Sequence, residues 1–136
     1  MMPWETKTVS RQPDGVAPDG SEVYLGLECS RGGLAVFVLP AGRISRAVRH
    51  QTIEEVWFFI EGEGEFWRRS GEAEELCRVG PGVFLTIPTG TAFQFRAFEG
   101  APLRFAIATM PPWPGGDEAL LADGPWVATA DVEFES

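Results

Sequence analysis

The sequence predicts a small all-β domain, and three observations support this class. Its 136 residues are a usual length for one domain and can bury a core without disulfides. The 16 glycines and 11 prolines are spread along the chain, and short apolar runs lie between them. Regularly spaced breakers between short apolar runs are typical of many short strands joined by turns. We expect one domain over residues 1–136, without internal repeats or linkers.

The chain begins with a polar segment and then changes to β-rich sequence. Residues 1–20 contain Pro13, Asp14-Gly15 and Pro18, which predicts a surface arm with turns. Residues 22–110 are rich in β-branched and aromatic side chains, which predicts the strands of a barrel. The expected strands are Glu22–Leu27, Leu34–Leu39, Ile53–Ile60, Glu65–Arg69, Leu76–Val79, Val83–Ile87, Thr91–Phe95 and Leu103–Met110.

The connections and the tail are predicted from their charges and breakers. Ser70–Glu75 is polar and acidic, so we expect a solvated hairpin turn there. A Pro- and Gly-rich stretch then opens an irregular tail over residues 111–136. Within this tail, Asp117–Ala122 predicts one or two helical turns, with Asp117 as the N-cap. Trp126–Phe134 predicts a returning edge strand.

Charge and composition exclude several classes of protein. The formal net charge is −9, whereas a nucleic-acid surface needs clustered Lys and Arg, so we expect no nucleic-acid partner. No apolar stretch approaches the roughly 20 residues that span a bilayer, so we expect no membrane partner. The start of the chain shows no basic or apolar leader. Cys29 and Cys77 do not form a CxxC pair. We therefore expect a cytoplasmic protein with reduced thiols.

Two stretches of the chain carry chemistry-bearing residues and glycines at characteristic spacings. In the first, Gly42, His50, Glu55 and Gly62 follow one another, with six residues between Glu55 and Gly62. The second reads Gly-Val-Phe-Leu-Thr-Ile-Pro-Thr-Gly over residues 82–90. Glycines at such positions allow tight reversals with a positive φ.

This pair of stretches resembles the two motifs of the cupin superfamily, and the resemblance covers roughly residues 34–110. It implies a small single-domain cupin with a double-stranded β-helix, that is, a jelly-roll barrel. It also implies a homodimer, in which exposed strand edges are covered. The sequence does not indicate which surface forms the interface.

The metal-ligand positions of the resemblance are largely replaced. The motif histidines fall on Val48, His50 and Phe93, and the motif asparagine falls on Ala97, so that His50 and Glu55 alone remain. The chain has a single histidine, which excludes a two-histidine iron site within one subunit. A catalytic zinc ion usually has three protein ligands. We therefore expect no metal site and no cofactor.

The same alignment predicts the lining of the interior pocket. Side chains two residues apart in a strand share a face, so Val48 lies beside His50 and Phe93 beside Phe95. Arg46 precedes the pocket strand and can hold an anionic group. We expect His50 and Glu55 to be the catalytic pair. The expected ligand-binding residues are Val48, Trp57, Phe93, Phe95 and Arg46.

Three functions are consistent with this pocket. The first is a metal-independent cupin that binds a small molecule and transfers protons through His50 and Glu55. The second is a metal-dependent oxygenase or isomerase with a non-standard site. The third is a non-catalytic ligand sensor or dimeric scaffold, in which aromatic residues fill the interior.

Overall fold

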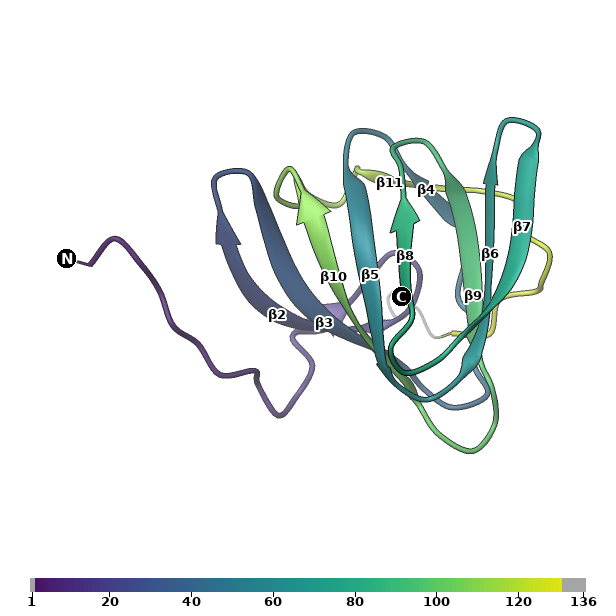
Figure 1. Cartoon of the computed structure of the whole chain (residues 1–136), viewed down its shortest axis with the longest axis horizontal. Coiled ribbons are helices and arrows are strands. Elements are labelled where there is room, and N and C mark those ends of the chain that lie inside the picture. The colour runs from purple at the N-terminus through teal and green to yellow at the C-terminus, as the bar shows by residue number, and fades with distance from the viewer. Residues whose placement is uncertain (1, 131–136) are drawn as a thin grey trace.

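A computed structural model describes residues 2–130, which form two antiparallel β-sheets with no helix among them (Figure 1). One sheet has six strands and the other has five. The first has the order β1 (Gly15–Val16), β2 (Glu22–Cys29), β3 (Gly32–Leu39), β10 (Leu103–Met110), β5 (Glu54–Glu61) and β8 (Phe84–Ile87). The second has the order β11 (Ala119–Leu121), β4 (Val48–His50), β9 (Ala92–Ala97), β6 (Gly64–Ser70) and β7 (Ala73–Val79).

The all-β jelly-roll prediction is confirmed, with one qualification about closure. Within residues 2–130 no strand pairing joins the two sheets, so they face each other as a sandwich and are not one continuous hydrogen-bonded barrel. Consecutive strands of the chain pass from one sheet to the other, as β4, β5 and β6 do. No helix in the described part of the chain is long and apolar enough to cross a membrane.

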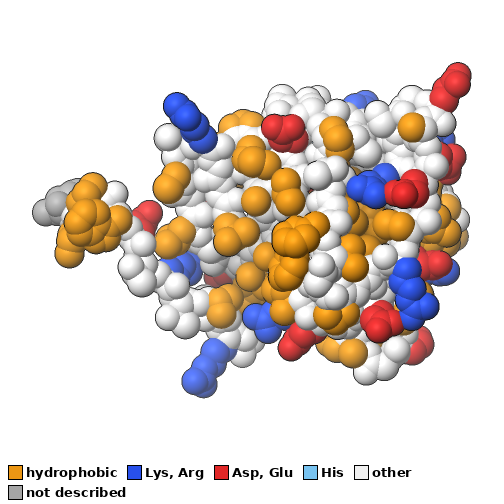
Figure 2. Space-filling model, in the orientation of Figure 1, with side chains coloured by type: hydrophobic (Ala, Val, Ile, Leu, Met, Phe, Trp, Pro, Cys, Tyr) orange, Lys and Arg blue, Asp and Glu red, His pale blue; other side chains and the backbone are white. Residues whose placement is uncertain are grey.

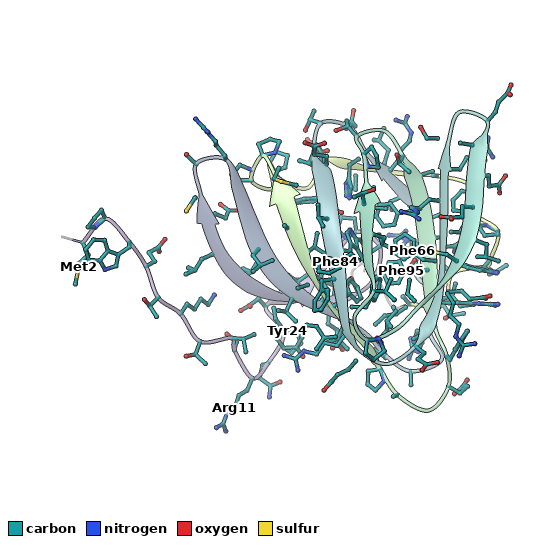
Figure 3. All side chains as sticks on the ribbon, viewed as in Figure 1. Met2, Arg11, Tyr24, Phe66, Phe84 and Phe95 are labelled. Carbon is teal, nitrogen blue, oxygen red and sulfur yellow. The ribbon has the colours of Figure 1, made fainter. Side chains whose placement is uncertain are left out.

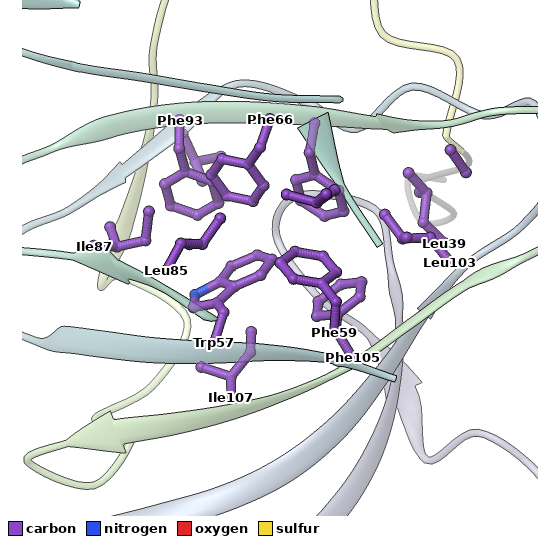
Figure 4. Packing of buried hydrophobic residues seen from close by; sticks show 14 of the residues in the cluster. Leu39, Trp57, Phe59, Phe66, Leu85, Ile87, Phe93, Leu103, Phe105 and Ile107 are labelled. Atoms are coloured by element: carbon purple, nitrogen blue, oxygen red, sulfur yellow. The ribbon is translucent and has the colours of Figure 1, made fainter. Parts of the chain in front are cut away.

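The core lies between the sheets, and its largest buried side chains are aromatic (Figure 4). Strand β5 shows why: its alternation buries Trp57 and Phe59 and exposes the residues between them. The Trp57 indole stacks on Phe105 at a centroid distance of 4.7 Å and meets Phe66 edge-on at 5.0 Å. Phe66 in turn stacks on Phe95 at 5.3 Å. Interlocked rings of this kind fix the spacing of the two sheets.

Glycine is required at the turn that follows β5. Gly62 has φ of 81°, and a Cβ there would lie 2.1 Å from the carbonyl oxygen of Pro102. Gly82 also has a positive φ, of 89°. The predicted tight reversals at both glycines are therefore confirmed.

The prediction of a solvated turn over Ser70–Glu75 is wrong for most of that segment. Strand β7 already begins at Ala73, so that only the Gly71-Glu72 tip turns. The acidic residues pair across the ladder with the basic residues of β6, Glu75 with Arg68 and Glu74 with Arg69. Opposite charges facing each other on two strands stabilise the pairing.

The tail also differs from its prediction. Residues 119–121 form β11, which pairs with β4, and no helical turn occurs over Asp117–Ala122. The Glu118 carboxylate accepts hydrogen bonds from Thr52 and Ile53, and this long-range tie holds the segment in an extended path. Residues 126–130 contain no strand, and the remainder of the expected Trp126–Phe134 strand lies outside the described residues.

The N-terminal arm extends away from the sheets, with Met2 and Arg11 far from the core (Figure 3). The segment that is free of the body ends earlier than residue 20. Strand β1 pairs with β2, and Asp19 is buried with only 6% of its surface exposed. The backbone nitrogen of Arg46 donates a hydrogen bond to the Asp19 carbonyl at 2.8 Å. The end of the predicted arm is therefore part of the folded body.

Candidate functional site

A hollow of about 650 Å³ lies between the β2–β3–β10 part of the six-stranded sheet and β4 of the other sheet. Its walls are mostly apolar, and a few polar side chains lie among them, which is the usual composition of a small-molecule site. The polar groups at its inner end are Asp19, His50, Glu55 and Thr109. The apolar lining includes Val23, Leu25, Leu27, Ala35, Phe37, Val48, Trp57, Phe93, Ile107 and Trp113.

His50 and Glu55 approach each other from opposite sheets. His50 is on β4 and Glu55 on β5, and the imidazole Nε2 lies 3.4 Å from Oε1 of the carboxylate. Each residue is only 5% exposed. The Nε1–H of Trp57 donates to Oε1 at 2.9 Å, and the hydroxyl of Thr109 donates to Oε2 at 3.3 Å. These donors fix the orientation of the carboxylate beside the imidazole.

The other nitrogen of His50 is unsatisfied. Nδ1 is buried and has no hydrogen-bond partner in the described structure. The ring lies between two aromatic side chains, Phe93 at 5.5 Å and Trp113, which meets it edge-on at 5.6 Å. A buried polar atom without a partner is costly, and such atoms are rare in folded proteins. The contact with Glu55 therefore uses only half of the bonding capacity of the imidazole.

Asp19 is a functional candidate that sequence reasoning missed. Its Oδ1 accepts hydrogen bonds from the backbone nitrogen and the hydroxyl of Ser21, at 2.9 and 2.6 Å. Burial raises the pKa of Asp19, the Ser21 hydrogen bonds oppose this rise, and the negative charge of Glu55 adds to it. In the sequence, Asp19-Gly20 is typical of a surface turn. Only the three-dimensional packing brings this carboxyl group to the hollow.

Most of the predicted pocket residues come together, and two do not. Val48, His50, Glu55, Trp57 and Phe93 all line the hollow. Phe95 is fully buried and packs against Trp57 at 5.2 Å, inside the core beside the hollow. Arg46 lies elsewhere: its side chain lines a second, more open depression together with Gln94 and Trp126. The structure therefore provides no anion clamp from Arg46 at the main hollow.

The residues around His50 and Glu55 do not fit a metal ion. Two of the positions that the cupin motifs reserve for histidine are Val48 and Phe93, which lie opposite each other on β4 and β9. Both oxygens of Glu55 already accept hydrogen bonds. Among residues 2–130, no three His, Cys, Asp or Glu side chains are close enough together to hold a cation. A divalent ion would have too few protein ligands at this site.

The comparison with protein families gives a match at the level of the domain. The family model described as "Cupin domain" matches residues 35–109. No curated protein sequence matches the chain significantly.

Solved structures with the same arrangement of strands share little sequence with this chain. The capsular polysaccharide assembling protein CapF from Staphylococcus aureus superposes with a TM-score of 0.70 at 13% identity. The match covers 88% of this chain but only 35% of CapF, so this chain spans about a third of that protein. An uncharacterized conserved protein with a double-stranded β-helix domain from Klebsiella pneumoniae gives 0.66 at 18% identity, over 88% of this chain and 100% of that one. PAC13 from Streptomyces, in a structure with uridine, gives 0.67 at 11% identity, over 88% and 92%. At these identities the likeness concerns the fold alone.

Proposed function

The chain belongs to the cupin family, which its match over residues 35–109 establishes, and on that premise we propose that it binds a small molecule between its two sheets. The ligand occupies the hollow next to His50 and Glu55, and no metal ion takes part in its binding. The solved neighbours support the fold and not the position of the site, because fold alone does not define function.

One observation carries the proposal: a buried imidazole–carboxylate pair lies in the lining of a mostly apolar hollow. When Nε2 of His50 carries the proton that faces Glu55, Nδ1 is left as a free basic nitrogen. Nδ1 then takes a proton from a carbon or oxygen of the ligand, and the electron pair stays on the ligand. The Glu55 carboxylate stabilises the resulting imidazolium ion through Nε2–H. The same imidazolium returns the proton at a neighbouring atom, which completes an isomerisation, or it protonates a leaving group as the bond from that group to the neighbouring carbon breaks, which completes an elimination.

A second candidate, a non-catalytic ligand-binding protein, is favoured by the packing of the rings. Trp57, Phe93 and Phe95 are at most 1% exposed, and their rings are in mutual contact at 5.2 to 6.5 Å. Rings held in this way form a rigid floor under the hollow. A rigid apolar floor supports binding without requiring any reaction.

The proposal is tested by hydrogen–deuterium exchange at ligand carbon atoms. The protein is dialysed against a chelator and incubated in D₂O with a panel of small ketones, aldoses and hydroxy acids, and proton NMR follows the loss of the C–H signal beside each carbonyl. We expect the wild-type protein to accelerate exchange in at least one compound. His50→Ala and Glu55→Gln should abolish that acceleration.

Glu54→Gln is the matched control, because Glu54 is next to Glu55 on β5 but is exposed on the opposite face. It should exchange at the wild-type rate. Compounds that bind but do not exchange would support the non-catalytic candidate. If no compound binds and none exchanges, the proposed small-molecule site is wrong.

A further inference from the structure

The charges around the hollow are strongly unequal. The carboxyl groups of Asp19 and Glu55 lie at its inner end, and Glu5 and Glu28 lie along its wall. Among the described residues that line it, Lys7 is the one Lys or Arg, and it lies on the exposed N-terminal arm. A ligand in the hollow therefore meets a negative potential, which the low-polarity walls strengthen.

The inner end of the hollow can bond a ligand chiefly through acceptors. Glu55 presents a carboxylate, and the free Nδ1 of His50 is an acceptor whenever Nε2 holds the proton. Both hydrogen bonds from Ser21 fall on Oδ1 of Asp19, so a ligand can reach this carboxyl group through Oδ2. The unpartnered and almost fully buried imidazole nitrogen is independent evidence that a bonding group is missing at this point.

An anion would be poorly accommodated here. Arginine, the residue that pairs best with carboxylate and phosphate, is placed elsewhere: Arg46 lines the second depression and Arg49 is exposed on β4. A positive or hydrogen-donating group, in contrast, relieves the unfavourable proximity of the two buried carboxyl groups.

We propose that the hollow selects uncharged or cationic ligands with an apolar body and discriminates against anions. This inference rests on the small-molecule site proposed above. The hydrogen-donating group of the ligand lies between Asp19, Glu55 and His50. Its apolar body lies against the inner faces of β2 and β3, which present Val23 and Phe37. The class includes amines, alcohols and neutral rings, and it excludes carboxylates and phosphates.

Three probes of one size test this selectivity: benzylammonium, benzyl alcohol and benzoate. Each is titrated into the ¹⁵N-labelled protein, and the indole N–H signal of Trp57, which bonds to Glu55, reports occupancy. We expect benzylammonium to bind most tightly, benzyl alcohol next, and benzoate at least about tenfold more weakly than benzylammonium. Glu55→Gln and the isosteric Asp19→Asn should each narrow this difference several-fold. The exposed Asp123→Asn, which changes the same total charge, should leave it unchanged.

The outcomes separate this inference from the function on which it rests. If none of the probes shifts the Trp57 signal, the small-molecule site itself is wrong. If all three bind equally, or benzoate binds most tightly, the site stands and the charge selectivity is overturned. A preference that Asp123→Asn removes as effectively as Asp19→Asn would also overturn it, because the effect would then come from net charge.

A separate observation concerns the outer face of the six-stranded sheet. Register places five apolar or aromatic side chains side by side across five strands. These are Tyr24, Val36, Ala106, Phe58 and Phe84. A parallel row contains Leu34, Ala108 and Val56. The space-filling view shows hydrophobic side chains gathered over these strands (Figure 2).

A solvated antiparallel sheet usually has polar side chains on its outer face. Here Phe84 is 69% exposed and Val56 38% exposed, and the two rows contain no charged residue. Beside these rows, the buried Nε of Arg104 has no hydrogen-bond partner in the described chain. Its own row contains Glu61 on one side and Val38 and Glu22 on the other. The face therefore leaves an apolar area uncovered.

We infer that, in the homodimer that the family resemblance implies, this face is the one that the two copies bury against each other across a two-fold axis. Five strands about 4.8 Å apart, each with several residues of about 3.3 Å, give a face of roughly 500 Å², which is of the same order as the ~800 Å² per partner of a standard interface. In a two-fold arrangement the same patch meets itself.

Sedimentation equilibrium tests the dimer. We expect the wild-type protein to have twice the mass of one chain and Phe84→Lys, a change at a well-exposed position, to be monomeric. Leu76→Lys is the control, because Leu76 is 54% exposed but lies on β7 of the other sheet, and it should remain dimeric. A monomeric wild-type protein, or a dimer that Phe84→Lys leaves intact, would overturn the inference.

Discussion

The indole of Trp57 and the carboxylate of Glu55 are two residues apart on one strand, and Nε1–H donates to Oε1 over 2.9 Å. The same indole stacks on Phe105 and forms part of the floor of the hollow. One side chain thus links the packing of the core to the orientation of the carboxylate beside His50. Stability and site geometry are therefore coupled at Trp57.

Trp57→Phe should destabilise the protein by about 3 kcal/mol, because it removes a bond to a charged acceptor and leaves a cavity in a packed core. Chemical denaturation measures the loss. Trp67→Phe is the comparison, since Trp67 also donates to a carboxylate, that of Glu74, but Glu74 is exposed. Its hydrogen bond is replaced by water, so its loss should be clearly smaller. Equal losses of unfolding free energy in the two variants would contradict the idea that burial makes the Trp57–Glu55 hydrogen bond the more stabilising one.

Glu118→Gln should weaken the attachment of β11. Burial of Glu118 favours its neutral form, but hydrogen bonds from Thr52 and Ile53 outweigh this effect and lower its pKa. A group with a lowered pKa in the folded state stabilises the fold above its unfolded pKa, and this contribution is lost as the pH falls through the folded pKa. At neutral pH we expect a loss of about 2 kcal/mol.

Denaturation curves measured from pH 7 downward test the sign of this effect. The difference between wild-type and Glu118→Gln proteins should shrink as the pH falls below about 4. A difference that stays constant over this range would mean that the ionised carboxylate is not the source of the stabilisation.

The fold could be predicted from sequence because its signals are local. Alternation within β5 indicated that Trp57 faces inward and lies on the same face as Glu55, and the glycine at position 62 indicated the reversal that follows. Both depend on backbone geometry within a few residues. The motif spacing also predicted correctly that His50 and Glu55 lie close together, although they are on different sheets.

The remaining features depend on contacts between distant parts of the chain. Asp19 has the local sequence of a turn, and its burial results from packing against the segment before β4. Strand β11 has the local sequence of a capped helical turn, but its pairing with β4 overrides that preference. Trp113 follows a proline-rich stretch without any periodic pattern, so its contact with His50 gave no local signal.

Metal removal should have no effect on this protein. With His50 and Glu55 as the remaining motif ligands, and Val48 and Phe93 in the other positions, we expect less than stoichiometric Mn, Fe, Co, Ni, Cu or Zn by elemental analysis of untagged protein. Treatment with a chelator should leave the melting temperature unchanged, because no metal-binding energy contributes to folding. A transition metal at one ion per chain, with a melting temperature that falls on its removal, would instead support the metal-dependent alternative.

Asp19→Asn should change how stability depends on pH. Burial raises the pKa of Asp19 in the folded state, and the charge of Glu55 raises it further. The unfolded chain therefore releases this proton first as the pH rises above about 4. The stability that protonated Asp19 contributes is lost progressively until the pH passes the folded-state pKa, and the loss is constant beyond that point.

Asparagine cannot ionise and still offers an oxygen to Ser21, so the Asp19→Asn variant should gain stability relative to wild type over this interval. Denaturation midpoints of both proteins, with Asp123→Asn as the control for net charge, measure the difference. A difference that falls with rising pH would show that the ionised form of Asp19 is the one that the fold favours.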